Sequence, residues 1–428
     1  MKKSFFLFLS LGLLGVIVFL FLSFHSKNLS DYEYGYNQKS SQITFFGFKW
    51  ESANVTAIET LISDFMARNP SVTVLYESIK GRDYFPVLLK RIATGNGDDV
   101  FMVDHDSLLT LSRQGCLKDL SGLPEIRTYS NLALSQMREP DGAVYFLPMS
   151  ISAFGLYCNL DLLNKYNVSI PRTYQDFLEA CRVFSDAGIT PVVANNDISL
   201  KTLVLARGLY DLYEGEDTAQ RLAALNSGQT RLSAYLKPGF ELLKHLCDRG
   251  YIDPEKTLRT TKTKDDLVEF ARGESPFMLT GVWASVRMEK MVEFPYKVVP
   301  YPVREDGPVL VINIDIRLAL NAHAKEPEEA LRFLRHMVTP SAIAAYNLSQ
   351  ASFSPLQETP PLPDDAVRDI GEHLRKGRIM LGADGHLDFP IWEITRVASR
   401  MLVEGASVEE AMRYLDETVD LALAGGKK

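Results

Sequence analysis

The sequence predicts an α/β protein built on a mainly parallel, helix-covered sheet. Strand-like and helical segments alternate from Gln42 onward, and the helical segments carry apolar residues on one face. The series begins with the strand ITFFGF (43–48), a helix over 54–70, the strand SVTVLY (71–76), a second helix and the strand VFMV (100–103). This βαβαβ order favours parallel pairing, in which ligands bind beyond the carboxyl ends of the strands.

The later elements continue the alternation. The run DGAVYFLPMSISAFGLYCNLDLLNKY (141–166) combines strand segments and a proline with a following helix. Thr173 and Asp176 have capping-box spacing at the start of the next helix. We expect further helices near 200–212, 235–249, 264–272 and 326–338, strands in SPFMLTGVWA (275–284) and LVINIDIRLAL (310–320), and a helical last 70 residues.

Length and composition narrow the class of protein. A chain of 428 residues allows two domains, or two lobes of one. Hydrophobic residues make up 46% and charged residues 23%, as in an ordinary globular protein. The net charge of −8 argues against a nucleic-acid partner, because phosphate neutralisation requires a basic surface.

No motif indicates catalysis, a metal or a cofactor. The cysteines have neither C-x-x-C spacing nor neighbouring histidines, which argues against a zinc site. No G-x-S-x-G, H-E-x-x-H or P-loop sequence occurs, so we expect neither enzyme activity nor a cofactor. Disulfides and buried thiols both remain open, with buried thiols favoured, for Cys116, Cys158, Cys181 and Cys247.

Residues 1–25 are expected to form a membrane anchor or a signal segment. Lys2 and Lys3 precede an uncharged run from Phe5 to Phe24, long enough for a helix that spans a bilayer of about 30 Å. The lysines favour a cytoplasmic N-terminus, which places the rest of the chain outside. No A-x-A-like site follows, so an uncleaved anchor is favoured over cleavage near 23–30. The polar residues 26–41 are expected to form a tether.

Five segments, taken in order, carry a family resemblance. They are ATGNGDDVFMVDHDSLLTLSRQGCLKDL, DGAVYFLPMSISAFGLYCNLDLLNKYNVSIPRTYQDF, FARGESPFMLTGVWA, NAHAKEPEEALRFLRHMVTPSAIAAYNLSQASFSPL and VASRMLVEGASVEEAMRYLDETVDLAL. Each is a weak signal alone, but together the chain resembles the family 1 extracellular solute-binding proteins of ABC importers, of the maltose-binding-protein-like carbohydrate type. The likeness runs from about Ile43 to Ala424. In departure from the family pattern, Tyr174 stands where a tryptophan is usual, and the lipid-accepting cysteine is absent.

The resemblance implies a two-lobed periplasmic-binding-protein-like fold with a ligand cleft between the lobes. Each lobe would be a mainly parallel sheet flanked by helices, and hinge strands would join them so that a solute closes the lobes. The resemblance places lobe 1 at 42–147 plus 303–340, and lobe 2 at 150–300 plus 343–425. It also implies a monomer that works with ABC permease subunits.

Aromatic residues are the first candidates for ligand contact, because an indole covers the apolar face of a sugar ring. Trp283 follows a strand end and occupies the stacking position that the resemblance implies; the alternative is an indole packed on its own lobe. Trp392 matches another stacking position, and Arg396 lies one helical turn further. The alternatives are a core aromatic for Trp392 and a surface ion pair for Arg396. Trp50 ends the first strand, where a loop is expected to meet solute.

Polar candidates for binding sugar hydroxyls follow the other strands. Asp104 and Asp106 come after VFMV and are expected either to bind solute or to cap the next helix. Glu77 follows the second strand, and Ser152 lies just past the hinge, where a buried strand serine is the alternative. One residue of the polar loop 195–197 is also expected to reach the cleft.

These expectations favour a membrane-tethered receptor that captures a carbohydrate, with an oligosaccharide preferred, and presents it to an importer. One alternative is a sensor with the same fold that signals to a membrane kinase or a chemoreceptor. Others are a receptor for a solute that is not a sugar and an exported glycoside hydrolase. The sequence defines neither the particular sugar nor the affinity.

Overall fold

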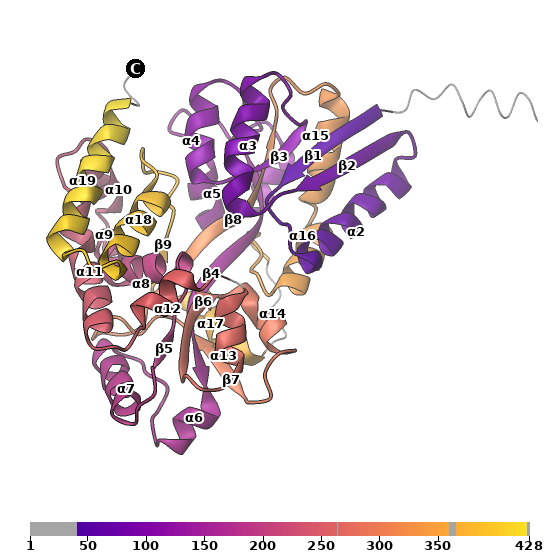
Figure 1. The fold of residues 1–428 in the computed structure, drawn as a ribbon. Coiled ribbons are helices and arrows are strands. Elements are labelled where there is room, and N and C mark those ends of the chain that lie inside the picture. The colour runs from indigo at the N-terminus through magenta and orange to yellow at the C-terminus, as the bar shows by residue number, and fades with distance from the viewer. Residues whose placement is uncertain (1–40, 263, 359–364, 426–428) are drawn as a thin grey trace, which may run out of the picture.

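The computed structural model describes residues 41–262, 264–358 and 365–425. Its strands form a nine-stranded sheet in the order β2-β1-β3-β8-β4-β6-β5, with β7 paired to β4 and β9 paired to β8. Helices flank the sheet, and two lobes are joined through β4 and β8 (Figure 1). The predicted anchor, residues 1–25, lies outside the described ranges. Within those ranges, no helix combines the length and the hydropathy needed to cross a membrane.

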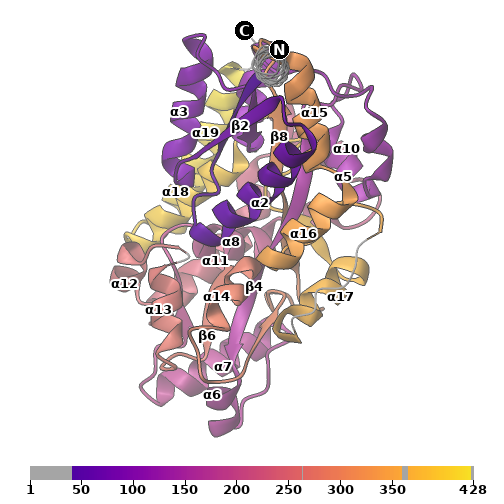
Figure 2. The ribbon, with the colours of Figure 1, turned by 90° about the vertical axis from the view of Figure 1, so that its right-hand side faces the viewer.

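Lobe 1 is built around β1, which pairs in parallel with both β2 and β3. The predicted apolar face of α2 packs inward through Ile58, Leu61, Ile62 and Phe65, and α15 and α16 pack against this helix (Figure 2). The elements of lobe 1 are β1 (Ser41–Gly47), α2 (Ser52–Arg68), β2 (Val72–Ser78), α3 (Gly81–Ala93), β3 (Val100–Val103), α4 (His105–Arg113), η1 (Pro124–Thr128), α5 (Asn131–Met137), α15 (Pro327–Met337) and α16 (Pro340–Gln350).

Lobe 2 contains most of the helices. Its centre is a buried bundle in which α8 packs on α11 and α18, and α19 covers α11 and α18. The predicted capping box of Thr173 and Asp176 is confirmed at the start of α7. The helices of lobe 2 are α6 (Leu160–Lys165), α7 (Tyr174–Asp186), α8 (Ile198–Gly208), α9 (Tyr210–Tyr213), α10 (Thr218–Asn226), α11 (Leu232–Asp248), α12 (Pro254–Arg259), α13 (Asp265–Ala271), η2 (Val282–Ala284), α14 (Ser285–Met288), η3 (Asp365–Val367), α17 (Arg368–Lys376), α18 (Ile391–Val403) and α19 (Val408–Gly425).

The remaining strands connect the lobes and complete the sheet: β4 (Leu147–Asn159), β5 (Val192–Val193), β6 (Phe277–Gly281), β7 (Tyr296–Val299), β8 (Leu310–Leu320) and β9 (Ile379–Leu381). Strands β4 and β8 run antiparallel, with Pro148 opposite Arg317 and Phe154 opposite Val311. At one end β8 pairs with β3 of lobe 1, and at the other end β4 pairs with β6 and β7. The two long strands are therefore two of the covalent links that the predicted hinge requires.

The α/β class and the two-lobed form are confirmed, but the sheet is more mixed than predicted. Parallel pairing occurs in β1–β2, β1–β3, β5–β6 and β8–β9. The pairs that involve β4, and the β3–β8 pair, are antiparallel. The reason is that β4 and β8 each cross between the lobes once, in opposite directions, and local periodicity does not report such long-range pairing.

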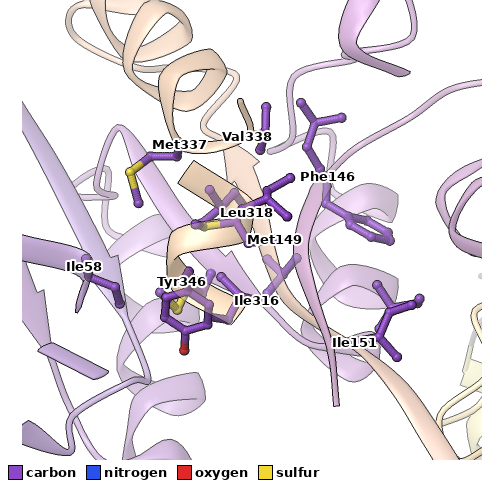
Figure 3. Packing of buried hydrophobic residues seen from close by; sticks show 14 of the residues in the cluster. Ile58, Phe146, Met149, Ile151, Ile316, Leu318, Met337, Val338 and Tyr346 are labelled. Carbon is purple, nitrogen blue, oxygen red and sulfur yellow. The ribbon is translucent and has the colours of Figure 1, made fainter. Parts of the chain in front are cut away.

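The hinge strand β8 contains an unusual backbone conformation at Ile316. This residue has φ 41°, although it is β-branched and fully buried. Positive φ costs about 1–3 kcal/mol for such a residue and persists only where surrounding packing enforces it. Figure 3 shows Ile316 among the packed side chains of Met149 and Tyr346, which belong to the same buried cluster. The strained residue thus sits where the chain passes from one lobe to the other.

Helix α16 belongs with lobe 1 by its contacts. Tyr346 Oη donates a hydrogen bond of 2.6 Å to Asn54 Oδ1 of α2, and Asn347 donates to the Met149 carbonyl. The sequence-based division assigned residues 343–425 to lobe 2. We propose instead that the chain returns to lobe 2 after Gln350, and we keep the other boundaries as proposed.

Candidate functional site

Two of the three tryptophans lie against the same phenylalanine of β4. The ring of Trp283 meets Phe154 edge to face, with ring centroids 5.3 Å apart, and the ring of Trp392 lies 5.4 Å from the same centroid. Trp283 belongs to η2 just after β6, and Trp392 belongs to the first turn of α18. Both indoles are half-buried. The structure therefore brings these two predicted residues together, and their contact with a solute stays a prediction.

Two glycines make room for the indoles. A Cβ on Gly281 would lie 2.2 Å from the ring of Trp283, and a Cβ on Gly382 would lie 2.6 Å from Cζ3 of Trp392. Both distances are far shorter than a side-chain contact allows, so each indole lies directly on glycine backbone. This close approach fixes the two ring planes before any ligand arrives.

A buried lysine lies over one of these rings. Lys201 Nζ is 4.2 Å from the ring centroid of Trp392, and the side chain is almost inaccessible to solvent. The ammonium is bonded to Asp197 Oδ1 at 2.7 Å, and Lys262 binds the other carboxylate oxygen at 2.8 Å. Burial acts to raise the pKa of Asp197, but the charges of these two lysines hold that pKa well below its usual range. Burial lowers the pKa of Lys201 to about 8, although the negative charge of Asp197 acts to raise it.

The expectation that one residue of the loop 195–197 reaches the cleft stays a prediction. Asp197 precedes α8 and makes no side-chain cap there; its carboxylate instead holds Lys201. Asn195 is buried and donates to Asp266. Sequence reasoning missed Lys201, although a lysine inside the apolar run ISLKTLVLA was a signal that a charged group is buried there.

On the lobe 1 side, the start of α4 carries two aspartates with different roles. Asp104 is the N-cap: its Oδ1 accepts hydrogen bonds from the backbone and hydroxyl of Ser107 at 2.8 and 2.6 Å. The capping alternative is thus confirmed for this residue. Asp106 Oδ1 is buried and has no hydrogen-bond partner among the described residues. Burial is the main reason why the pKa of Asp106 is raised to about 8. The negative charges of Asp104 and Glu393 raise this pKa further, and the positive charge of Lys201 lowers it.

Arg317 of β8 is the second residue that sequence reasoning missed. It is 2% exposed, and its Nη1 has no hydrogen-bond partner in the described part of the chain. Nε donates to the Ile314 carbonyl, and the guanidinium lies 5.0 Å from the Phe146 ring. Burial lowers the pKa of Arg317, and the charges of Asp104 and Asp106 act against that shift. An arginine within the apolar strand LVINIDIRLAL was the available signal.

Side chains of the two lobes contact one another beside these groups. Gln136 of α5 donates at 3.0 Å to Asp384 Oδ1 and accepts at 2.7 Å from the Gly385 amide, both in the segment after β9. Asp384 also accepts from Tyr213 and His386. Burial acts to raise the pKa of Asp384, but the bond from His386 keeps it below its usual value. These bonds hold α5 of lobe 1 against lobe 2.

The remaining predicted residues have separate surroundings. Trp50 is 43% exposed and lies 5.6 Å from Lys80 Nζ. The expected contact of Trp50 with a solute stays a prediction. Glu77 is exposed and forms a two-pronged ion pair with Arg91 at 2.8 Å.

Arg396 and Ser152 complete the predicted set. Arg396 pairs with Glu393 on the same helix, which is the ion pair proposed as its alternative. Ser152 is buried in β4 opposite Asn313. A hollow of about 500 Å³ lies elsewhere, between α9, the loop 306–308 and the α17–β9 junction, and neither Trp283 nor Trp392 lines it. The rings, Lys201, Asp106 and Arg317 are therefore the groups that the structure concentrates near the lobe boundary.

Such an arrangement suits a molecule with an apolar face and polar edges. The two indoles and Phe154 form an aromatic wall on lobe 2. Asp106 of α4 stands near enough to that wall for its charge to interact with Lys201, and Arg317 of β8 acts on Asp106 in turn. In the described residues no group of three or more His, Cys, Asp or Glu side chains is arranged to hold a metal.

Comparisons with known proteins agree with this architecture. A family model described as bacterial extracellular solute-binding protein matches residues 60–369. The multiple sugar-binding protein of Streptococcus mutans is 21% identical over 350 residues, which is 78% of this chain and 80% of that protein.

Solved structures with the same fold include a chitin oligosaccharide binding protein, with TM-score 0.74, 18% identity, and coverage of 90% of this chain and 100% of that one. Another is a Bacillus licheniformis sugar transporter protein in complex with stachyose, with TM-score 0.71, 17% identity, and coverage of 89% and 100%. Because the family model matches well over half of the sequence, this chain belongs to the bacterial extracellular solute-binding protein family.

Proposed function

We propose that this protein is an extracytoplasmic receptor that captures an oligosaccharide between its lobes and delivers it to an ABC importer. The observation that carries the proposal is the pair of indoles, Trp283 and Trp392, packed on Phe154 within reach of charged groups from lobe 1. Aromatic rings pack against the C–H face of a pyranose, while carboxylates, ammonium and guanidinium groups bind its hydroxyls.

The separate aromatic groups and the polarity of the site support an oligosaccharide over a small apolar solute. The exposed Trp50 and the Trp283–Trp392 pair offer aromatic surface at separate places, as a ligand of more than one ring requires. An apolar solute would leave buried polar groups such as Arg317 without hydrogen bonds, and this cost in free energy would weaken its binding. The names or titles of the relatives given above mention a sugar or an oligosaccharide, which favours the same ligand class for this chain.

The full chain, purified in a detergent without a sugar headgroup, tests the proposal by tryptophan fluorescence. We expect a saturable change with at least one oligosaccharide of a panel, because a ring stacked on Trp283 or Trp392 changes the surroundings of that indole. A panel without any saturable response, confirmed by calorimetry, would contradict oligosaccharide capture. Glycoside turnover during the titration would favour the hydrolase alternative instead.

The cellular setting is also a proposal. We infer that the apolar segment 5–24 anchors the receptor on the outer face of the membrane, since no lipid-accepting cysteine follows it. An intact N-terminus in the mass of the membrane-extracted protein supports the anchor, and a start near residues 23–30 contradicts it. Light scattering at micromolar concentration tests the proposed monomer.

The absence of a lipid-accepting cysteine and the proposed membrane anchor are also compatible with a sensor, which is the second candidate. In that case the closed receptor would contact a membrane kinase or a chemoreceptor in place of permease subunits. Deletion of this gene separates the two: loss of uptake of the bound sugar indicates import, and unchanged uptake with a lost transcriptional response indicates sensing.

A further inference from the structure

Near Trp392, two buried cations keep hydrogen-bond donors for which the described residues provide no partner. Arg317 is 2% exposed, and its Nη1 has no partner among the described residues, while Nε and Nη2 reach the carbonyls of Ile314 and Ala383. A buried guanidinium that lacks one partner costs free energy, because that N–H has given up water without a replacement.

Lys201 adds donors on the opposite side of the site. Its ammonium has three N–H groups, of which Asp197 Oδ1 accounts for one at 2.7 Å. The group also lies over the Trp392 ring, 4.2 Å from its centroid, so it covers part of one face of that indole. A charge fixed at this position interacts with any sugar ring that packs on the rest of the Trp283–Trp392 wall.

The nearby carboxylates are already occupied. Glu393 forms a two-pronged pair with Arg396, Asp197 is shared by two lysines, and Asp104 caps α4. Asp384 accepts from Tyr213, Gln136 and His386. These acids therefore leave the spare N–H groups of Lys201 and Arg317 without an anionic partner of the protein's own.

Asp106 is a third buried polar group without a complete set of partners in the described residues. Its Oδ1 is buried and unpartnered, and its pKa is raised to about 8 by burial, by Asp104 and by Glu393. A carboxyl that keeps its proton at neutral pH donates an O–H hydrogen bond instead of accepting one. The charges of Lys201 and Arg317 both oppose this rise in pKa. Arg317 Nη2 reaches the Ala383 carbonyl next to Gly382, which lies against Trp392, and Lys201 lies over the same indole.

We propose that the site selects saccharides that carry a carboxylate, such as oligosaccharides with a uronic acid residue. The anion would accept hydrogen bonds from Lys201, Arg317 and protonated Asp106 while the ring that bears it packs on the Trp392–Trp283 wall. This inference rests on the proposed oligosaccharide function and names the charge class of its ligand. A carboxylate pairs with these donors through charge-assisted bonds, which are stronger than those of a hydroxyl.

Matched sugars test the inference on the full chain. Calorimetry compares digalacturonate with galactobiose of the same linkage, and glucuronate-ended with glucose-ended disaccharides, at pH 6.5 and moderate salt. We expect the acidic member of at least one pair to bind about 10- to 100-fold more tightly. Neutral members that bind as tightly as, or more tightly than, their acidic partners would overturn the inference and leave the proposed function standing. Absence of binding by every saccharide would instead overturn the proposed function, and the inference with it.

Variants locate the selectivity. Lys201→Met should remove about tenfold of the acid preference while neutral sugars keep their affinity within about threefold. Lys262→Met is the matched control, because Lys262 binds the same Asp197 from a partly exposed position and lies outside the aromatic contact. Equal loss of acidic and neutral binding in Lys201→Met, with an unchanged melting temperature, would contradict a role in selectivity.

The wild-type pH profile gives an answer even if Lys201→Met fails to fold. Burial lowers the pKa of Lys201 to about 8 and raises the pKa of Asp106 to about 8, and a bound carboxylate favours the protonated form of each group. The affinity for an acidic sugar should therefore fall about tenfold or more between pH 6 and pH 9, while the affinity for a neutral sugar changes little. A flat profile for the acidic sugar would overturn the inference.

Discussion

The two faces of the site differ in how completely they are assembled without a ligand. On lobe 2, Trp283 and Trp392 lie on Phe154 and on glycine backbone, and Lys201 is held by Asp197. On lobe 1, Asp106 Oδ1 lacks a hydrogen-bond partner in the described residues, and so does Nη1 of Arg317. The comparison teaches that the aromatic wall is preorganised, whereas the opposite face still has unsatisfied polar groups that a ligand can satisfy.

The largest loss of stability in a single variant is expected from removing the carboxylate that holds Lys201 in the lobe 2 face. Asp197→Ala leaves Lys201 buried without its carboxylate, and we expect a loss of about 3–5 kcal/mol in the free energy of unfolding. Urea denaturation measures it. Lys262→Met serves as the control, since the exposed lysine should cost less than about 1 kcal/mol. A loss no larger than the control's would show that Lys201 is not held in this way.

A smaller but local effect should follow from filling the space under Trp283. Gly281→Ala places a methyl group where the indole lies, so we expect oligosaccharide affinity to fall by about 2 kcal/mol, or roughly 30-fold. Gly122→Ala is the matched control, because a Cβ there meets no atom within 4 Å. Calorimetric titration of both variants provides the comparison. Equal affinities would mean that the position of Trp283 does not matter for binding.

Asp106 makes the lobe 1 face sensitive to pH. Because its pKa is raised to about 8 in the folded protein, the folded state keeps a proton that the unfolded state releases above about pH 4. Its contribution to stability therefore falls as pH rises from about 4 to 8, by at most about 1.4 kcal/mol per pH unit.

The Asp106→Asn variant lacks this titration, so its stability relative to wild type should increase with pH across the same window. Denaturation midpoints at several pH values measure the difference. Parallel curves for variant and wild type would contradict the buried, unpartnered carboxyl.

The smallest loss of unfolding free energy is expected from replacing Asp104. Asp104→Ala removes the cap of α4 and should cost about 1 kcal/mol of unfolding free energy, up to about 2. Asp106→Asn on the same turn, at neutral pH, should cost nothing or stabilise the protein. Thermal denaturation of the two variants compares them directly, and a reversed order would mean that the roles of the two aspartates are exchanged.

Local patterns predicted much of this molecule. The apolar face of α2, the capping box at Thr173 and the strand end at Trp283 all follow from spacing within a few residues. The family resemblance contributed the two lobes and the positions of Trp283 and Trp392. These features were predictable because each depends on neighbours in sequence or on a motif order that the whole family shares.

Other features depend on long-range contacts that local patterns do not contain. The antiparallel pairing of β4 with β8 joins strands separated by most of lobe 2, and it makes the sheet mixed. Lys201 of α8 and Arg317 of β8 were visible only as charges within apolar runs. Nothing in those runs reveals that both charges interact with Asp106. Glu77 was predicted at a strand end, but the structure gives its carboxylate to Arg91.

The central claim is that an oligosaccharide packs on Trp283 and Trp392 at the boundary between the lobes. Calorimetric titration of the best-binding sugar against wild type and the double variant Trp283→Ala/Trp392→Ala tests it most directly, with the exposed Leu421→Ala as the control. We predict a loss of at least about 2 kcal/mol, more than roughly 30-fold in affinity, in the double variant alone. An unchanged affinity in a folded double variant would contradict the account.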